Sequence, residues 1–193
     1  MTGPSIHRAS NDQYSTITLA LRELTKLGYK RIGMAMPAES DERVKRNWSA
    51  GMLVYQQQIP EADRVPSLLS TGSFSHSFED WFREHQPEAV LSLAWQVLKV
   101  LKEMKLRVPE DVGFAHLALT ASDHDCAGVN QNSEVVGAAA VDLVDAQLRR
   151  NERGIPEFSK TLLVPGQWVA GPTVRGSSVE SQRAPELASA LVS

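Results

Sequence analysis

Short apolar runs of strand length alternate with longer segments of helical periodicity, and this alternation restricts the fold more than any other feature. Residues 13–27 repeat apolar side chains at helical spacing, and Gly28 follows them as a residue that readily takes the left-handed conformation after a helix. An apolar run at 31–36 comes next and ends at Pro37. The pattern predicts an α/β fold: a doubly wound parallel sheet with helices on both faces, in three layers.

The rest of the chain extends this pattern. We expect further helices from Ser40 or Asp41 to Ile59 and at 78–85, 95–104 and 133–150. Strands are expected at 65–70, 89–93, 112–117 and 160–164, with a brief extended piece at 127–130. Residues 1–12 are polar and aperiodic and are interpreted as a lead-in segment. Residues 13–175 form the α/β domain, and the serine-rich residues 176–193 are interpreted as a flexible tail.

Composition excludes several classes of protein. The net charge of −3 provides no global basic field for nucleic acid or an anionic membrane. No run of about 18 apolar residues is present, and the first ten residues lack the pattern of a signal peptide. Cys126 is the only cysteine, so no internal disulfide can form. These features favour a cytoplasmic protein without membrane contact.

The common catalytic motifs are absent. No G-x-G-x-x-G follows a strand, and neither a phosphate-binding P-loop nor a G-x-S-x-G elbow occurs. Cys126 has His124 and Asp125 as neighbours, but catalytic partners usually converge from separate segments, so we expect an ordinary thiol. For the same reason the polar run 123–125 is interpreted as a solvated loop rather than a metal site. The sequence therefore predicts no enzyme, no cofactor and no metal.

Aromatic residues near strand ends are the best candidates for ligand contact. In parallel sheets, ligands bind beyond the carboxyl ends of the strands. Trp95 falls just after an expected strand, and His116 lies at the end of another, where a hydrogen-bonded structural role is an equal alternative. Trp48 lies on the apolar stripe of its helix, so the core is its default place. Trp81 and Trp168 are interpreted as structural.

Several short motifs between residues 8 and 175 occur in an order and spacing that resemble one family. Asp12, Leu24 and Gly28–Ile32 match a helix followed by Gly-His-x-x-Ile, with Tyr29 in place of histidine. The most specific fragment, Val108–Val112, matches a V-P-x-D-V turn. Similar fragments are Arg43–Met52, Pro87–Val90, Ala127–Gln131, Gly137–Ala140, Leu162–Val164 and Thr173–Arg175. Together these motifs resemble the LacI/GalR family, the lactose-repressor family of bacterial transcriptional regulators.

The resemblance implies a ligand-sensing, effector-binding domain with a periplasmic-binding-protein-like fold. It implies a small-molecule effector, a sugar or sugar derivative, and operator DNA bound only through a separate N-terminal domain. The chain would hold mainly the family's second subdomain, with helix 133–150 belonging to the first. It also implies a homodimer, in which helix 95–104 and loop 118–126 match the family's pairing positions. The alternatives are a periplasmic-type sugar-binding protein, against which the missing signal sequence speaks, and an enzyme of the doubly wound class.

The chain departs from the family at its ligand positions. Trp48 stands where the family has an effector-binding arginine, with Arg46 nearby, and Ala118 replaces an aspartate. The family's Asn-Asp turn is shortened at Ser92–Trp95. Combining the resemblance with the strand-end rule, we expect the effector surface to include Asp12, Tyr14, Arg46, Trp48, Trp95 and His116.

Overall fold

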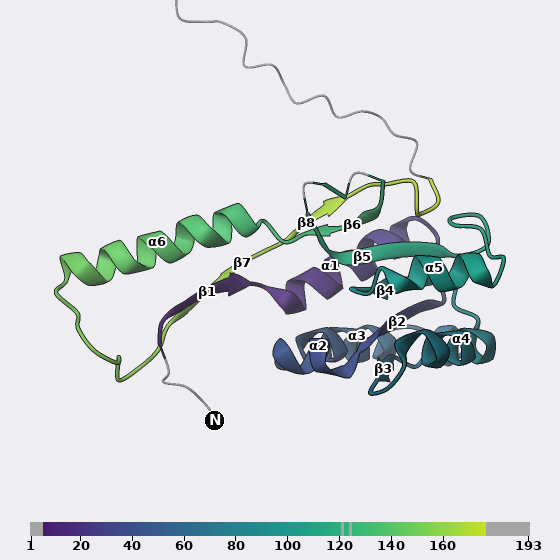
Figure 1. Cartoon of the computed structure of the whole chain (residues 1–193), viewed down its shortest axis with the longest axis horizontal. Coiled ribbons are helices and arrows are strands. Elements are labelled where there is room, and N and C mark those ends of the chain that lie inside the picture. Colours follow the sequence, from purple (N-terminus) through teal and green to yellow (C-terminus); the bar gives the residue numbers. More distant parts are fainter. Residues whose placement is uncertain (1–5, 121, 124, 177–193) are drawn as a thin grey trace, which may run out of the picture.

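A six-stranded sheet forms the centre of the molecule (Figure 1). The structure is a computed structural model that describes residues 6–120, 122–123 and 125–176. The strands run in the order β3-β2-β4-β5-β6-β8, and all neighbours are parallel except β6 and β8. They are β2 (Ile32–Pro37), β3 (Leu68–Ser70), β4 (Ala89–Ser92), β5 (Gly113–Leu119), β6 (Ala127–Asn130) and β8 (Gln167–Val169). The predicted α/β class is thereby confirmed.

Helices cover both faces of this sheet, as the alternating pattern predicts. On one face, α1 (Gln13–Lys26) and α3 (Asn47–Gln57) pack over Met34 and Met36 of β2. On the other face, α4 (Phe74–His85) and α5 (Gln96–Glu103) pack over Ala35. Gly33 shares the α4 face, and a Cβ there would lie 2.6 Å from a ring carbon of Trp81. Successive side chains of β2 therefore point to opposite faces of the sheet and contribute to the hydrophobic core on each face.

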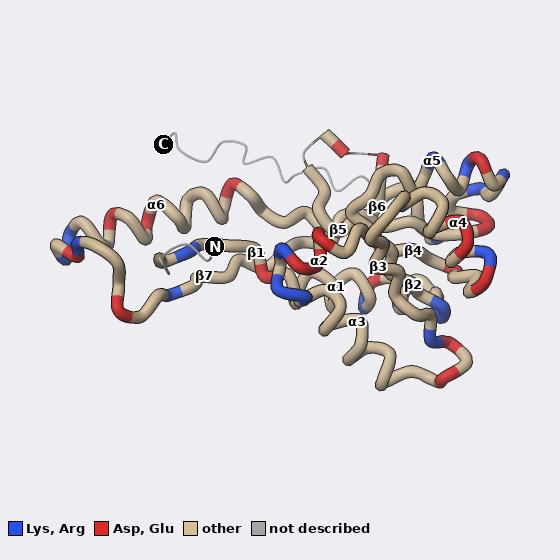
Figure 2. The backbone as a smooth tube through the Cα atoms, turned by 60° about the horizontal axis from the view of Figure 1, so that its bottom comes forward, with Lys and Arg blue, Asp and Glu red and all other residues tan. Residues whose placement is uncertain are grey.

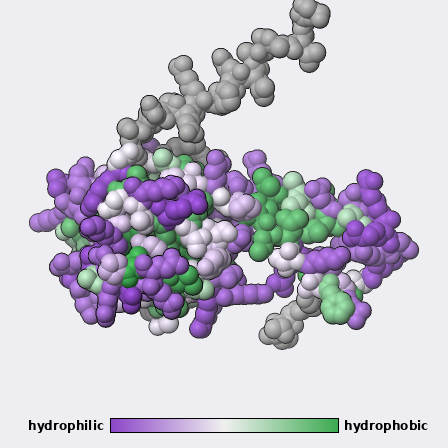
Figure 3. All heavy atoms as spheres, turned by 180° about the vertical axis from the view of Figure 1, so that it is seen from behind, coloured by the Kyte–Doolittle hydropathy of each residue, from purple (hydrophilic) through white to green (hydrophobic). Residues whose placement is uncertain are grey.

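A smaller unit, here called the arm, extends from this body (Figure 1). It consists of the parallel strands β1 (Arg8–Asn11) and β7 (Thr161–Val164), with α6 (Ser133–Arg149) packed on them. None of the described side chains of α6 is fully buried. Figure 3, a view from behind, shows hydrophobic residues gathered on the arm. A helix with apolar residues on its open face has a surface suited to a partner.

Three chain segments join the arm to the body, at residues 11–13, 130–133 and 164–167. Side-chain amides tie these segments together. The amide of Asn11 donates to the carbonyl of Gln131, and the Gln131 amide donates to the Leu117 carbonyl at 2.8 Å. The Asn132 amide donates to the Pro165 carbonyl at 3.0 Å. These hydrogen bonds hold the arm against the body.

One expected helix is divided in two. Instead of a single helix from Ser40 or Asp41 to Ile59, the chain forms α2 (Ala38–Arg43) and then α3. Lys45 and Arg46 both take the left-handed conformation, with φ of 58° and 59°. Asp41 does not cap the start of a long helix. Its buried carboxylate instead accepts hydrogen bonds from the backbone N–H and hydroxyl of Ser49 in α3, which stabilises the break.

Two strands were not expected from the sequence, and two other details differ. Strand β1 lies in the segment interpreted as a lead-in, and β8 follows β7 after a short connection. The helix expected at 78–85 begins at Phe74, and a short 3₁₀ helix forms at Glu61–Asp63. The strands therefore form two sheets rather than one.

Candidate functional site

The carboxyl end of β4 and the middle of β5 bring two aromatic rings together. Ser92 at the end of β4 lies beside His116 in the sheet register, and the chain then turns at Trp95 into α5. The Trp95 ring stacks on the His116 ring, with centroids 4.1 Å apart and planes 10° from parallel. Trp95 is 41% exposed, whereas His116 is buried. The pair therefore forms an aromatic platform at the carboxyl end of β4, and Trp95 is its exposed member.

Hydrogen bonds on both ring nitrogens define the protonation state of His116. Its Nδ1 accepts from the backbone N–H of Ala118 at 3.2 Å, so Nε2 carries the hydrogen and donates to the Leu93 carbonyl at 3.0 Å. Burial lowers the pKa of His116, against a smaller opposing effect of these hydrogen bonds. The platform is thus uncharged at neutral pH.

Two of the predicted polar residues are engaged in local structure. Asp12 caps α1, with one carboxylate oxygen accepting from the Ser15 backbone N–H at 2.9 Å and the other from its hydroxyl at 2.7 Å. Arg46 immediately precedes α3, and its guanidinium contacts the Glu42 carboxylate at 3.2 Å. Both residues stand at helix starts that face the arm end of the body.

Trp48 lies in the core. It is only 2% exposed and packs in the cluster between the sheet and helices α1 and α3. Its indole Nε1 has no hydrogen-bond partner within the described residues. In this conformation the Trp48 ring offers no open face to a ligand. Of the six predicted site residues, Trp95 and His116 are in contact with each other. The other four lie at the beginnings of α1 and α3: Asp12, Tyr14, Arg46 and Trp48.

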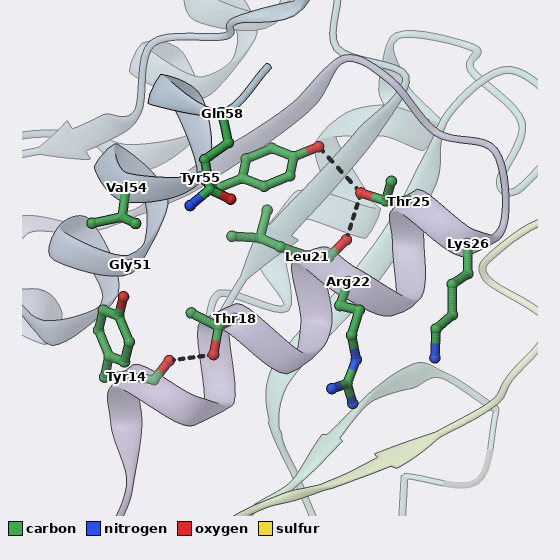
Figure 4. A pocket seen from close by; sticks show the side chains of 10 residues that line it. All are labelled: Tyr14, Thr18, Leu21, Arg22, Thr25, Lys26, Gly51, Val54, Tyr55 and Gln58. Atoms are coloured by element: carbon green, nitrogen blue, oxygen red, sulfur yellow. Dashed lines mark hydrogen bonds between the residues drawn. The ribbon is translucent and has the colours of Figure 1, made fainter.

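Tyr14 lines a cavity between α1 and α3 (Figure 4), and neither Trp95 nor His116 lines this cavity. This cavity has a volume of about 400 Å³, and Tyr14 is the only predicted residue that lines it. The backbone of α3 approaches α1 closely at Gly51, and the Tyr55 hydroxyl lies 3.2 Å from that of Thr25. Figure 4 shows Arg22 and Lys26 extending from α1 away from Tyr55.

A second cavity lies between the arm and the turn that joins α2 to α3. Its volume is about 180 Å³. Strands β1 and β7 form one wall, and the turn forms the other. The sequence pattern did not identify the residues of this cleft, because they become neighbours only through the left-handed turn at Lys45 and Arg46. The lining residues are Arg8, Ser10, Asn11, Gln13, Arg43, Val44, Lys45, Asn47, Thr161 and Leu163.

The described residues give little support to metal binding or to nucleophilic catalysis. Across residues 6–120, 122–123 and 125–176, no three His, Cys, Asp or Glu side chains are grouped to hold a metal ion, and His124 lies outside this part. Cys126 is buried, and burial raises the pKa of its thiol, which opposes a nucleophilic role. None of the helices in the described chain has the length and apolar character needed to cross a membrane.

The fold resembles those of solved transcription regulators. A regulator-like protein from Staphylococcus haemolyticus is 20% identical, with a TM-score of 0.64, 85% of this chain covered and 60% of that one. A LacI family regulator from Enterococcus faecium with bound ribose is 15% identical, with a TM-score of 0.61 and coverage of 90% and 67%. A transcriptional regulator in complex with cellobiose is 16% identical, with a TM-score of 0.63 and coverage of 90% and 55%. The chain thus spans about three fifths of the length of these structures.

The sequence comparison identifies the family directly. No match was found among curated proteins. Residues 21–174, however, match the family described as periplasmic binding protein-like domain. This match extends from α1 to the segment after β8 and so includes the whole six-stranded sheet. The chain therefore belongs to the periplasmic binding protein-like domain family.

Proposed function

We propose that the chain is the effector-binding domain of a LacI-type transcriptional regulator that responds to a sugar or sugar derivative. The observation that carries this proposal is the shared fold, which extends over 85–90% of the chain to transcription regulators. Two of those regulators are in complex with ribose and with cellobiose. The motifs that resemble the LacI/GalR family lie in the same region, so sequence and fold support one function.

The Trp95–His116 platform is the part of the proposed site best suited to a sugar. An aromatic ring stacks on the apolar face of a sugar, while nearby polar groups orient its hydroxyls. Trp95, which is 41% exposed, is the more accessible of the two rings and would make this contact. Arg46 at the start of α3 would supply a polar contact, whereas the Asp12 carboxylate is engaged at the start of α1 and Tyr14 lines the separate cavity between α1 and α3. Trp48 would support the start of α3 from beneath.

This role requires no catalysis and no cofactor. The fold and the matched structures are those of regulators, and the domain would act by binding alone. With a net charge of −3, binding of operator DNA would require a separate DNA-binding module. Such a regulator would work in the cytoplasm.

Self-association is part of the same proposal, because two-fold symmetry suits a regulator that reads two half-sites. Helix α5, which the sequence predicts to be part of the interface, is less suited to pairing than its apolar pattern indicates. The apolar residues Val97, Val100 and Leu101 of α5 are buried in the core of the body. They are therefore committed to folding rather than to a partner.

The proposal is tested by screening monosaccharides and disaccharides against the chain, first by thermal shift and then by calorimetry. At least one sugar should raise the Tm. Replacing Trp95 by alanine should weaken the binding of that sugar about tenfold, a loss of about 1.4 kcal/mol in binding free energy. Trp95→Phe retains a ring and should recover most of the affinity.

Phe158→Ala is the matched control, since Phe158 is an exposed aromatic residue in the loop after α6 and far along the chain from the platform. It should bind the sugar as the unmodified chain does. Two results would refute the proposed site: unchanged sugar binding by Trp95→Ala, or equal weakening by Phe158→Ala.

A further inference from the structure

The cleft between the arm and the body is lined by positive charge without any carboxylate. Three of its lining residues are cationic, namely Arg8, Arg43 and Lys45, and none is acidic. The remaining lining residues include two hydroxyl and three side-chain amide groups, which can donate hydrogen bonds. Figure 2 shows the Lys and Arg positions of the α2–α3 turn beside the strands of the arm.

The backbone places these cations from two separate units. Arg43 is in the last turn of α2, and Lys45 follows in the left-handed conformation, which turns the chain sharply. Arg8 comes from β1, on the arm side of the cleft. A bound group would therefore be held between the arm and the body rather than on one surface.

The nearby acidic groups are already engaged. Asp41 accepts hydrogen bonds from Ser49, and Glu42 pairs with Arg46. Asp12 is occupied by the cap of α1. In the described part of the chain, no ion pair within 4.0 Å involves Arg8, Arg43 or Lys45. Among the described residues, these three charges thus lack a counter-ion.

The start of α3 adds to the positive potential. Asn47, the first residue of this 11-residue helix, lines the cleft, and the first turn contains no acidic residue. The amino end of a helix carries a partial positive charge that favours anions. Charge, helix orientation and hydrogen-bond donors therefore all favour the same class of ligand.

The size of the cleft limits what it can enclose. Its volume of about 180 Å³ is below the roughly 300–1,000 Å³ of usual small-molecule pockets. It would accommodate the charged end of a ligand, with the rest extending along the opening between arm and body. Guanidinium groups bind phosphate and carboxylate through paired hydrogen bonds.

We propose that the effector is an anionic sugar derivative whose phosphate or carboxylate is bound by Arg8, Arg43 and Lys45. This inference rests on the proposed function and narrows it, because it assigns a charged ligand to this chain, whereas two of the matched regulators are in complex with the neutral sugars ribose and cellobiose. The basic cleft would select the charge of the ligand.

Calorimetric titration at low salt tests this directly. The probes are hexose and pentose phosphates, the corresponding uronic acids, the neutral parent sugars, and inorganic phosphate. A sugar phosphate or uronic acid should bind at least about tenfold more tightly than its neutral parent. Added salt should weaken this binding, because exposed charges are screened. Comparing the phosphate and uronic acid series shows which anion the site prefers, and binding of inorganic phosphate alone would show that the cleft holds the charge without the sugar.

The double variant Arg43→Gln/Lys45→Gln should lose most of this preference. Its matched control is Lys102→Gln/Lys105→Gln, which removes one charge from the last turn of α5 and one from the left-handed residue that follows it. The control should bind the anion normally. Equal affinities for charged and neutral sugars, or normal anion binding by the cleft variant, would overturn the inference.

The two proposals can fail separately. A neutral sugar that binds as tightly as its anionic derivatives and loses affinity in Trp95→Ala would support the proposed function and overturn the anionic site. Absence of binding by every probe would overturn both.

Discussion

The imidazole of His116 lies flat against the indole of Trp95 while both of its nitrogens bind backbone groups of Leu93 and Ala118. This arrangement requires the neutral ring, because Nδ1 can accept the Ala118 N–H only when it carries no hydrogen. Protonation of His116 would therefore cost this hydrogen bond as well as the desolvation of a buried charge. The platform thus couples the stability of the fold to pH.

The first prediction concerns that coupling. Burial lowers the pKa of His116 from the ordinary value of 6.5, so below about pH 6.5 the unfolded chain binds a proton that the folded chain does not. The His116 contribution to stability is therefore complete above this pH and is lost as the pH falls. Denaturant titrations from pH 8 to pH 5 should show a decline in the free energy of unfolding, and His116→Gln should show a smaller decline.

His76→Gln provides the control for this experiment, since His76 is an exposed histidine on α4. It should retain the full decline of the unmodified chain. An identical pH dependence in His116→Gln would show that other groups cause it.

The second prediction compares two tryptophans. Trp95 is exposed on one side, so Trp95→Ala should lower the free energy of unfolding by about 1 kcal/mol, the value of an aromatic contact. Trp81 is buried, and its Nε1 donates to the Pro66 carbonyl at 2.7 Å. Trp81→Ala should therefore cost about 3–5 kcal/mol. Denaturation monitored by circular dichroism distinguishes the two, and similar losses would contradict the different roles assigned here.

The local pattern of the sequence was sufficient to predict the sheet and its covering helices. Buried parallel strands are nearly continuous apolar runs, and amphipathic helices repeat at 3.6 residues, so β2, β4, β5 and helices α1, α5 and α6 were all found. The placement of Trp95 after a strand was also sound. Its stacking on His116 depends on the pairing of Ser92 with His116, which no local pattern records.

The parts of the fold and of the site that the local pattern does not predict depend on contacts between segments that are distant in the sequence. Strand β1 is short and polar, and it becomes a strand only because Arg8 to Asn11 pair with Thr161 to Val164 near the other end of the domain. The basic cleft was missed for a related reason. In one continuous helix, Arg43 and Lys45 would lie on different sides of the helix, and only the break after α2 places both beside the arm.

The third prediction uses two glycines in different surroundings. A methyl group at Gly33 would lie 2.6 Å from the Trp81 ring, so Gly33→Ala should destabilise the fold by about 1–3 kcal/mol. Gly137 lies within α6 with no atom near its missing side chain. Gly137→Ala should stabilise the fold by about 0.5–1 kcal/mol, because glycine is a poor helix former. Opposite shifts in Tm are expected, and a stabilising Gly33→Ala would contradict the close packing of α4 on β2.

The last prediction concerns the open face of α6. Gly137, Val141, Val144 and Leu148 follow one another at spacings of four, three and four residues, which places them on one side of the helix. Val144 is 54% exposed and Leu148 is 73% exposed. A second copy of the chain is the partner that self-association would bring to this face. In an antiparallel pair of α6 helices, the acidic Glu134 at the start of one copy would approach the basic end of the other at Arg149 and Arg150.

The double variant Val144→Lys/Leu148→Lys should therefore lower self-association in sedimentation equilibrium while leaving the Tm nearly unchanged, since neither side chain is buried in the single chain. Leu53→Lys is the control, because Leu53 is a similarly exposed apolar residue, 61% accessible, on α3 of the body. It should associate as the unmodified chain does. If the α6 variant associates as strongly as the control, or if the unmodified chain is monomeric at high concentration, α6 does not carry a homodimeric contact. A large fall in Tm for the α6 variant would instead show that Val144 and Leu148 contribute to the stability of the arm itself.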